Sequence, residues 1–531
     1  MMAQKVAVCP VEALEDGEMR QFSVADREVL LARFEGEFWA IAPKCTHAGA
    51  KLADGVMMNG HVVCPWHHAC FSLRSGQMLE PPALNDLAQY PTSIEADTVY
   101  VELSNLKGSN GEESRVPELA NQKSDDRTFV IIGGGAAGCA AAQMLRQVKF
   151  EGRIVLITAS EEPPYDRTKL SKAYLQQDQA DDLDLLRPIS FYRRYDITLK
   201  TATKVTKLDA KAQTITYGEG ESIQYDTLLL ATGGAVKKIP IDGSDLDNVF
   251  TLRQAQDARA ILEASKQAEK VVIVGSGFIG MEVASSLNQQ GLEVTIVTPN
   301  AVPFENVLGE QVGKLMMQIH ESHGVKFKLE SKATAFKGDG KIDSVELENG
   351  DVLPADMVVV GIGVQPATDF IEGIALDEDD KSIPVNQYLQ AAPNVYAAGD
   401  IAQFPHFITG ESVRIEHWRL AMQHGRTAAR NMTGESVAFK SVPFFWAGQY
   451  DVKLRYIGHA EKWDDVVIQG SLEDKSFLAF YVKDKQILAV AGIGRDRDIA
   501  AISGLMNGKQ MPSASELQKK DIDWIERLRR R

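Results

Sequence analysis

Two thiols and two imidazoles gather near the start of the chain, in the stretch CTHAGAKLADGVMMNGHVVCPWHHAC at residues 45–70. Cys45 and His47 form a C-x-H pair, and Cys64 and His67 form a C-x-x-H pair. Two thiolates and two imidazoles can ligate a 2Fe–2S cluster asymmetrically, with both cysteines on one iron and both histidines on the other. A structural zinc site and a chance grouping are the alternatives, but two to four residues usually lie between paired zinc ligands, and C-x-H has only one.

The segment around these four residues predicts an all-β domain. Residues 1–105 contain short stretches rich in β-forming residues, such as EVLLARF, EFWAIA and TVYVEL, separated by turn signals. His61 and His68 have no position in the ligand pattern, so we expect them to be surface or packing residues. The polar segment 106–127 reads as a linker that spans about 26 Å as a flexible coil. The first domain is then free to move, unless an interface holds it.

The first 105 residues resemble a Rieske domain. High-potential Rieske proteins join their two ligand loops by an extra disulfide, and here the corresponding positions are Ala50 and Trp66. The family also uses hydroxyl groups near the second loop to hydrogen-bond the cluster, whereas this chain has ACF at residues 69–71. Because such donors stabilise the reduced cluster, the resemblance implies a low reduction potential, about −150 mV.

Two glycine-rich loops later in the chain predict dinucleotide binding. GGGAAG at 133–138 and GSGFIG at 275–280 share the G-x-G-x-x-G spacing, each between a strand-like and a helix-like segment. The glycines permit a tight turn and let a pyrophosphate lie against the helix N terminus. One such motif is weak evidence, but two in the same setting indicate FAD at the first loop and NAD(P)H at the second. The loop residues expected to bind are Gly133, Gly135, Ala136, Ala137, Gly138, Gly275, Gly277 and Gly280.

Strands that alternate with helices from Phe129 onwards predict parallel, doubly wound sheets. A β pattern returns from about Val442 and ends in a charged helical tail. The predicted fold class is multidomain, with an N-terminal all-β Rieske domain, two doubly wound α/β dinucleotide-binding domains and a C-terminal α+β interface domain. The expected limits are 1–105 for the first domain, 106–127 for the linker, 128–250 with 376–440 for FAD, 251–375 for NAD(P)H and 441–531 for the interface domain.

The whole chain resembles the apoptosis-inducing-factor-like flavoproteins, which fuse a Rieske domain to a ferredoxin-reductase-type FAD/NAD unit. The resemblance covers nearly all 531 residues and rests on motifs such as CPWHHACF, PYDRTKLSK, GIGVQPAT, VYAAGDIA and VPFFWAGQYDVKLRYIGHA. It implies that Lys172 pairs with Glu282 at the point of hydride transfer, where the lysine stabilises reduced flavin and the glutamate orients the nicotinamide. The other cofactor contacts that it implies are Arg167, Thr232, Gly233, Gly363, Gly399, Asp400, His417, Trp418 and Trp446.

Simpler interpretations stand beside these roles. An isolated Arg or Lys is ordinarily a solvated surface residue, and a carboxylate in a first helical turn, such as Glu282, is ordinarily explained by the helix dipole. Phe444 and Phe445 are expected in the core of the last domain. Cys139, alone in an Ala-rich helix, is expected to be core packing, because the segment RTKLSKAYL lacks the cysteine pair of a disulfide reductase.

The remaining signals concern the coenzyme and iron chemistry. The strand GLEVTIV is followed by Thr298 where an acid would favour NADH, but no nearby arginine could take the 2′-phosphate of NADPH, so we expect NADH. His320 and His323 lie close in sequence without the carboxylate partner of an oxygenase iron site. We expect them on a helix surface.

Composition and net charge argue against some classes of binding partner and some cellular compartments. A net charge of −16 argues against nucleic acid and anionic membrane surfaces as partners. Five cysteines form no disulfide framework, which favours a reducing compartment. The first residues lack the pattern of a signal peptide, and no apolar run reaches the roughly 18 residues of a membrane span. We therefore expect a cytoplasmic protein with no membrane insertion.

Together these features predict an FAD-dependent NAD(P)H oxidoreductase. Electrons would pass from NAD(P)H via FAD to a low-potential Rieske 2Fe–2S cluster, and on to an external one-electron acceptor protein such as a terminal oxygenase. Two alternatives remain open: a redox-sensing or signalling flavoprotein, and a quinone or small-molecule reductase in which the Rieske domain is regulatory.

Overall fold

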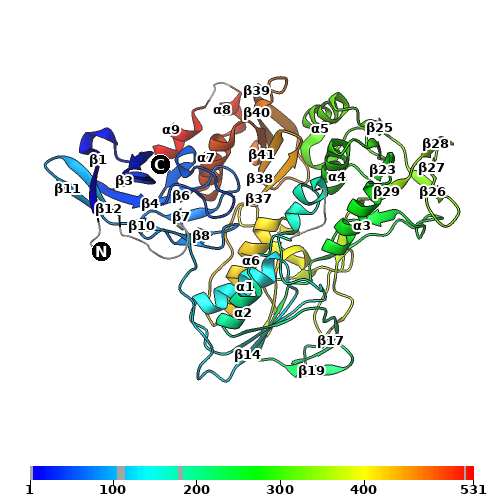
Figure 1. Cartoon of the computed structure of the whole chain (residues 1–531), viewed down its shortest axis with the longest axis horizontal. Helices are drawn as coiled ribbons and strands as arrows, with labels where there is room; N and C mark the ends of the chain where they lie inside the picture. The colour runs from blue at the N-terminus through cyan, green and yellow to red at the C-terminus, as the bar shows by residue number, and fades with distance from the viewer. Residues whose placement is uncertain (1–3, 104–113, 178–182, 519–521, 531) are drawn as a thin grey trace.

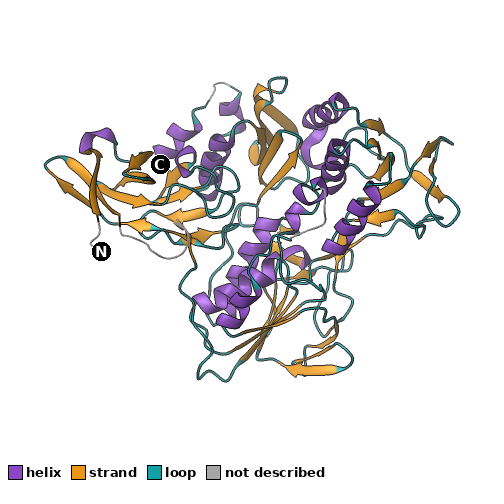
Figure 2. Ribbon diagram, in the orientation of Figure 1, coloured by secondary structure: helices purple, strands orange, loops and turns teal. Residues whose placement is uncertain are grey.

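The chain forms four bodies in the computed structural model, which describes residues 4–103, 114–177, 183–518 and 522–530. Figure 1 shows the N-terminal body (blue) beside the C-terminal one (orange and red), a body around α4 (green), and a body around β14 below them. The N-terminal body is built almost wholly of strands, whereas helices accompany the sheets of the other three (Figure 2).

Three small sheets make up the N-terminal body. Their strand orders are β10-β4-β3-β2, β5-β6-β7-β8 and β1-β12-β11. In β12, buried and part-exposed residues alternate along TVYVEL, as expected of a strand with one face on a core. The strands are β1 (Gln4–Pro10), β2 (Met19–Val24), β3 (Arg27–Phe34), β4 (Glu37–Ile41), β5 (Val56–Met58), β6 (His61–Val63), β7 (Cys70–Ser72), β8 (Met78–Glu80), β10 (Gln89–Tyr90), β11 (Thr92–Glu95) and β12 (Thr98–Leu103).

The first α/β body has the six-stranded sheet β16-β15-β14-β20-β34-β33, in which only the β33–β34 pair is antiparallel. Its central strands are continuous apolar runs because both faces are covered. Helices α1 and α6 pack together so closely that a Cβ on Gly425 would lie 2.0 Å from the Ala137 carbonyl oxygen. The elements are β14 (Thr128–Ile132), α1 (Ala136–Gln147), β15 (Arg153–Ile157), β16 (Ile197–Lys200), β20 (Thr227–Leu230), β33 (Gln390–Ala392), β34 (Val395–Ala397) and α6 (Trp418–Met432).

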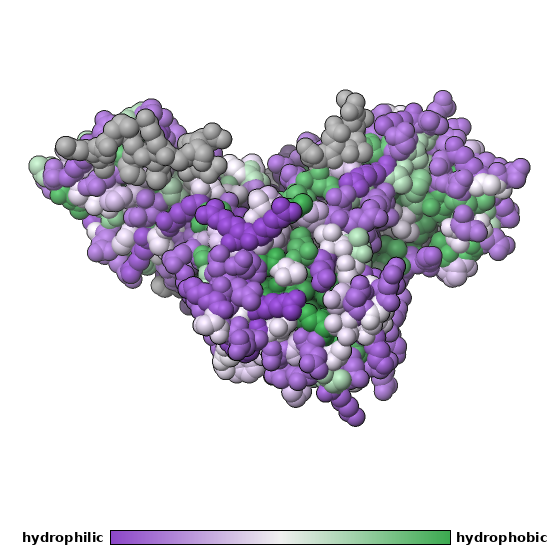
Figure 3. Space-filling model, turned by 60° about the horizontal axis from the view of Figure 1, so that its bottom comes forward, coloured by the Kyte–Doolittle hydropathy of each residue, from purple (hydrophilic) through white to green (hydrophobic). Residues whose placement is uncertain are grey.

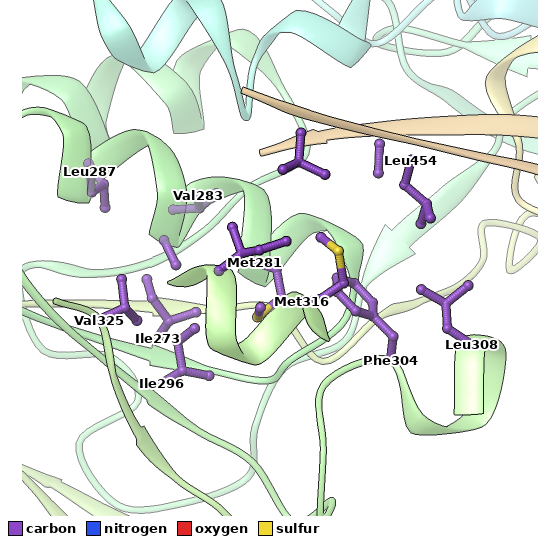
Figure 4. Close-up of a cluster of buried hydrophobic side chains, with 14 of the residues drawn as sticks. Ile273, Met281, Val283, Leu287, Ile296, Phe304, Leu308, Met316, Val325 and Leu454 are labelled. Carbon is purple, nitrogen blue, oxygen red and sulfur yellow. The ribbon is translucent and has the colours of Figure 1, made fainter. Parts of the chain in front are cut away.

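The second α/β body has the parallel sheet β22-β29-β23-β24-β25. Figure 4 shows its core, in which Met281 of α4 and Met316 of α5 pack near Leu454 of the C-terminal sheet. One hydrophobic core therefore continues across these two bodies. The elements are β22 (Val249–Thr251), α3 (Ala255–Ser265), β23 (Lys270–Val274), α4 (Phe278–Gln289), β24 (Glu293–Val297), α5 (Glu305–Ser322), β25 (Lys326–Lys328) and β29 (Met357–Val360).

The C-terminal body is an antiparallel sheet, β37-β38-β41-β40-β39, covered by short helices. Its core also includes Val56, Val63 and Cys70 of the N-terminal body, so the two bodies share buried apolar surface. The elements are β37 (Phe444–Gln449), β38 (Val452–Gly458), β39 (Asp465–Ser471), β40 (Ser476–Lys483), β41 (Gln486–Ile493), α7 (Asp496–Asn507), α8 (Ala514–Leu517) and α9 (Trp524–Arg529). No helix in the described ranges is long and apolar enough to cross a bilayer.

The expected linker is only partly a spacer. Residues 106–113 lie outside the described residues, but Ser114–Arg115 form β13 and pair with β9 (Asp86–Leu87) of the N-terminal body. Further along, Leu119 packs against the core of the first α/β body, and the Ala120 N–H donates to the Arg146 carbonyl (2.9 Å). The second half of the segment is therefore attached at both ends rather than a free coil.

Candidate functional site

The four predicted cluster ligands lie on two loops that close in the same way. The loop after β4 is closed by hydrogen bonds from the Cys45 N–H to the Ala50 carbonyl and from the Gly49 N–H to the Cys45 carbonyl, both 2.9 Å. In the loop between β6 and β7, the Cys64 N–H donates to the Ala69 carbonyl at 2.9 Å. These turns present each cysteine and its histidine from a fixed backbone.

The four ligand side chains meet as one pair of imidazoles and one pair of thiols. The Nδ1 atoms of His47 and His67 are 3.0 Å apart. A hydrogen bond between the two thiols lowers the pKa of Cys64 and raises that of Cys45. Burial lowers the pKa of His67 to about 2, which keeps its imidazole neutral and able to bind metal. Two sulfurs on one side and two Nδ1 atoms on the other fit a 2Fe–2S cluster, which takes two protein ligands per iron.

No group of three or more His, Cys, Asp or Glu residues in the described ranges converges as ligands of a single ion. The neighbours of the four ligands have other roles. His68 is buried and stacks on Phe444, with ring centroids 3.8 Å apart, as expected of a packing histidine, and His61 is half-buried in β6. Burial raises the pKa of the Cys70 thiol to about 12. Ala50 is buried, and Trp66 lies under the Lys453 ammonium group, 5.1 Å from its ring centroid.

Strand β37 carries aromatic side chains to both of its faces. Trp446 lies against His67, with ring centroids 4.4 Å apart, and 6.2 Å from the ring of His47. Phe445 points the other way, because successive side chains of a strand alternate, and contacts His417 (4.5 Å) and Phe278 (4.7 Å). Trp446 was predicted as a flavin contact; its observed neighbours are the predicted cluster ligands. Phe444 and Phe445 are buried, as predicted for core residues.

The first glycine loop forms an open phosphate cradle. Gly133 has φ +114°, and a Cβ on Gly138 would lie 1.9 Å from the Gly133 carbonyl oxygen, so both positions require glycine. Gly135 caps α1 without a side-chain hydrogen bond, and apart from its chain neighbours no described residue lies within 4 Å of where its Cβ would be. Ala136 and Ala137 begin the helix. The free N–H groups of this helix start are suited to the FAD pyrophosphate.

The second loop repeats this geometry at the start of α4. Gly275 has φ +109°, a Cβ on Gly280 would lie 2.3 Å from the Gly275 carbonyl oxygen, and the space beside Gly277 is open. At the end of β24, the hydroxyls of Ser276 and Thr298 are 2.8 Å apart and buried. The residues fit the pyrophosphate of a second dinucleotide.

Lys172 and Glu282 form the predicted pair across the boundary of the two α/β bodies. The lysine Nζ is 2.6 Å from Glu282 Oε2, and the glutamate side chain is only 4% exposed. The Ser171 hydroxyl donates to the same oxygen at 2.6 Å, and the Thr168 carbonyl accepts from Lys172 Nζ at 2.9 Å. Ser171 was not recognised in the sequence, although it stands next to Lys172 in the LSK motif. Glu282 is thus a buried carboxylate that accepts hydrogen bonds from both Ser171 and Lys172. Its role is therefore not limited to an interaction with the helix dipole.

A second charged group surrounds Asp400. Arg253 Nη2 is 2.8 Å from Asp400 Oδ2, and Arg414 Nη1 donates to the Asp400 carbonyl at 3.1 Å. Burial lowers the pKa of Arg167, and the nearby Arg253 acts in the same direction, so these three charged side chains lie close together. Arg253 was not predicted from the sequence, because no motif surrounds it.

The other predicted contacts lie in turns or at helix ends. The Thr232 hydroxyl donates to the Ala367 carbonyl at 2.8 Å. His417 caps the N terminus of α6, and Trp418 begins that helix and packs against the core of the first α/β body. Three glycines adopt positive φ: Gly233 (+69°), Gly363 (+96°) and Gly399 (+78°).

Two histidines and a cysteine outside the site were also assigned from the sequence. Cys139 is buried in α1, as predicted, 3.5 Å from the Tyr192 hydroxyl. His320 was predicted on a helix surface, which is wrong: it is fully buried, with Nε2 2.9 Å from Gln449 Oε1. His320 follows the buried Val312 and Met316 at intervals of four residues, and the C-terminal body covers this face of α5. His323 is exposed and stacks on Tyr450.

Hydrogen bonds from the first α/β body hold the N-terminal body in place. Arg419 of α6 is buried and donates to the carbonyls of Pro81 (2.9 Å) and His68 (3.2 Å). Arg187 donates to the Leu84 carbonyl and to Asn85 Oδ1, both at 2.6 Å. Separating the bodies would leave these carbonyls and buried guanidinium groups unpaired. An interface therefore holds the N-terminal body against the first α/β body, a possibility that the sequence alone left open.

Figure 3 shows apolar residues near the centre of the view, where the lobes of the molecule meet. Two exposed isoleucines mark the second dinucleotide loop: Ile279 is 46% exposed and Ile362 is 38% exposed, and Ile362 lies beside Gly275. Apolar side chains at a loop with a free helix N terminus suit a ligand that is partly planar and partly charged.

Three family models match successive parts of the chain. A Rieske [2Fe-2S] domain matches residues 4–91, pyridine nucleotide-disulphide oxidoreductase matches 127–425, and a reductase C-terminal domain matches 444–526. Human apoptosis-inducing factor 3 is 36% identical over 98% of this chain and 86% of its own length. The ferredoxin–NAD(+) reductase component of the anthranilate 1,2-dioxygenase system of Burkholderia cepacia is 34% identical over 73% of this chain and 96% of its own length.

A solved structure agrees with these relatives. The covalent complex of putidaredoxin reductase with putidaredoxin contains a chain that matches with a TM-score of 0.72 and 28% identity, over 77% of this chain and 99% of that one. The cofactors expected from the motifs, FAD, NAD(P)H and a Rieske 2Fe–2S cluster, agree with these families. The chain therefore belongs to the pyridine nucleotide-disulphide oxidoreductases, as an FAD-dependent NAD(P)H oxidoreductase of the ferredoxin-reductase type that carries an N-terminal Rieske domain.

Proposed function

We propose that this reductase passes electrons from NAD(P)H via FAD to its own Rieske cluster, and from there to an external one-electron acceptor protein. The observation that carries the proposal is the contact of Trp446 with His67, with ring centroids 4.4 Å apart. On the opposite face of the same strand, Phe445 contacts His417 and Phe278, which come from the two nucleotide-binding bodies. Strand β37 thus directly joins the cluster ligands to the reductase.

The charged neighbours of His47 support the same direction of electron transfer. Burial lowers the pKa of His47, and the nearby charges of Asp166 and Lys169 act on it in opposite senses. Both residues belong to the segment PYDRTKLSK, which ends at Lys172. The His47 imidazole therefore lies near the segment that leads to the Lys172–Glu282 pair.

The residues of the chain have distinct tasks in this proposal. The glycine loops hold the two pyrophosphates at helix N termini. Glu282, fixed by Ser171 and Lys172, orients the nicotinamide, and Lys172 supplies a positive charge beside the flavin. Bound FAD supplies the conversion of a two-electron hydride donor into single electrons. Arg253 and Asp400 fix the flavin side chain.

We propose NADH as the coenzyme and a protein of an oxygenase system as a suitable acceptor. β24 is followed by Thr298, whose hydroxyl is engaged by Ser276, and no arginine follows that could bind a 2′-phosphate. A ferredoxin-reductase relative takes its name from a dioxygenase system, and another forms a complex with putidaredoxin. The missing hydroxyl donors at residues 69–71 favour a cluster of low potential.

The test compares two histidine variants of the full chain, His67→Ala and His61→Ala. His67 is a predicted ligand, whereas His61 is a half-buried neighbour in the same stretch. Under anaerobic conditions, NADH should bleach the flavin of both variants at the wild-type rate. Only His67→Ala should lose cytochrome c reduction, while ferricyanide, a small acceptor able to reach the flavin, should still be reduced by both.

Two results would contradict the proposal. Unchanged cytochrome c reduction by His67→Ala, with the cluster spectrum absent, would exclude the relay. Negligible turnover of the wild-type protein, with a long-lived NADH-reduced complex, would instead favour a redox sensor.

A further inference from the structure

We propose that Arg455, which the C-terminal domain contributes, sets the reduction potential of the Rieske cluster. Its buried positive charge stabilises the reduced cluster, and it thereby couples reduction to the docking of the Rieske domain. The inference requires only that the cluster be present in the docked domain. It does not depend on whether the cluster later reduces an external acceptor.

The sheet register places Arg455 on the side of the cluster. Arg455 of β38 is the direct cross-strand partner of Trp446 of β37. Directly opposite residues of an antiparallel pair project from the same face of the sheet. Trp446 contacts His67 from that face, so Arg455 projects toward the second ligand loop as well.

The guanidinium group is buried without enough partners of its own. Its side chain is 2% exposed, and its one acidic partner among the described residues, Asp496, is 3.6 Å away with a side chain 33% exposed. Arg455 Nε has no hydrogen-bond partner within the described part of the protein. Buried guanidinium groups ordinarily have paired charges and satisfied donors, so this one requires a further negative neighbour.

The second ligand loop supplies that neighbour. Burial lowers the pKa of Arg455, while Asp496 and the Cys64 sulfur oppose this shift. The charge of Arg455 in turn helps to lower the pKa of Cys64. When the cluster is present, its thiolate and sulfide charge lies on this side of the arginine.

Reduction of the cluster adds one electron and therefore one negative charge, and it forms or breaks no bond. A cation in a buried site favours that extra charge more than a cation in water does, because the effective dielectric constant is lower. The Rieske domain has Arg455 as a neighbour only while it is docked. By reciprocity, the factor by which docking favours reduction equals the factor by which reduction tightens docking.

This cation opposes the effect of the missing hydroxyl donors. The Rieske sequence alone predicts a low potential, because residues 69–71 offer no hydroxyl. Arg455 raises the potential from outside the domain, so the cluster in the whole chain is easier to reduce than its own loop sequence implies.

The test is a dithionite titration of the cluster-loaded, full-length protein, followed by EPR and visible spectroscopy. Arg455→Met should lower the equilibrium constant for one-electron reduction at least tenfold, a fall in midpoint potential of about 59 mV. Arg455→Lys keeps the charge, so its midpoint potential should lie close to that of the wild-type protein. Lys453→Met is the matched control, because Lys453 is two residues away on the same strand but exposed. It should change the midpoint much less.

Equal midpoints for Arg455→Met and Lys453→Met would overturn the proposal. A second measurement needs only the wild-type protein, in case the Met variant does not load its cluster. Amide hydrogen exchange in β5–β8 should be slower in the reduced than in the oxidised protein, because reduction tightens docking. Exchange that is unchanged or faster on reduction would overturn the coupling to docking.

Discussion

Lys172 Nζ and Glu282 Oε2 lie 2.6 Å apart, although 110 residues separate them in the chain. The pair joins the segment PYDRTKLSK of the FAD-binding body to the helix that follows the second glycine loop. Because the glutamate is buried and the lysine partly exposed, the lysine presents its charge at the boundary between the two nucleotide sites. One residue of the pair comes from each α/β body, and the hydrogen bonds to Glu282 fix both of them at the boundary of the two bodies.

Removal of Lys172 should slow flavin reduction by NADH. In Lys172→Met, Glu282 keeps its bond to Ser171 but the positive charge beside the flavin is lost, so the rate should fall on the order of 10²-fold. Stopped-flow absorbance of the flavin under anaerobic conditions measures this step. Lys169→Met is the control, since Lys169 lies on the same segment and pairs with Asp184 at the surface. A Lys172→Met rate equal to that of Lys169→Met would contradict the assigned role.

Gly277→Ala should greatly weaken NADH binding and leave the fold intact. The added Cβ meets no protein atom within 4 Å, and φ of −78° suits alanine, but the methyl group would occupy the space left for a pyrophosphate. The variant should retain FAD and remain reducible by dithionite, while KM for NADH rises steeply. Gly448→Ala, at another open position that has ordinary backbone geometry, should behave as wild type. Unchanged KM in Gly277→Ala would mean that the coenzyme binds elsewhere.

His424 should make stability depend on pH. It is fully buried, and its Nδ1 accepts the Gly399 N–H at 3.3 Å, so burial lowers its pKa to about 3. The folded-state pKa is below the unfolded value of about 6.5, so the stabilisation is complete above about pH 6.5 and is lost as the pH falls toward 3. Each pH unit in that window should cost about 1.4 kcal/mol of the free energy of unfolding.

Guanidinium unfolding of wild type and His424→Asn at several pH values measures this contribution. The asparagine oxygen can accept the same N–H but does not titrate in this range, so the variant should show the shallower decline below about pH 6.5. Parallel curves for the two proteins would show that His424 is protonated in the folded state.

The chemistry of each site could be predicted because its signal is local. Cys45, His47, Cys64 and His67 are held by two short loops whose own backbone hydrogen bonds close them. Gly133 and Gly275 adopt positive φ in turns of fixed shape. The glycine spacing within each loop therefore identifies the turn, whatever the rest of the fold. These motifs suffice to identify the Rieske domain, the two dinucleotide folds and the reductase family.

Residues without a motif could not be predicted, because their roles arise from neighbours distant in sequence. Arg253 reaches Asp400 across 147 residues, and Arg419 reaches Pro81 across 338. His320 was expected on a helix surface, yet Gln449 of the C-terminal sheet covers it. No pattern within one helix records which other body packs on it.

The sequence by itself therefore determined the cofactors, the order of the domains and the reductase family, because ligand spacing and turn geometry are properties of short segments. Only the tertiary structure decided that the Rieske domain is docked, with His67 against Trp446 and Arg455 on the same face of the C-terminal sheet. Docking depends on buried area and paired charges that several distant segments supply together, and no single segment encodes them.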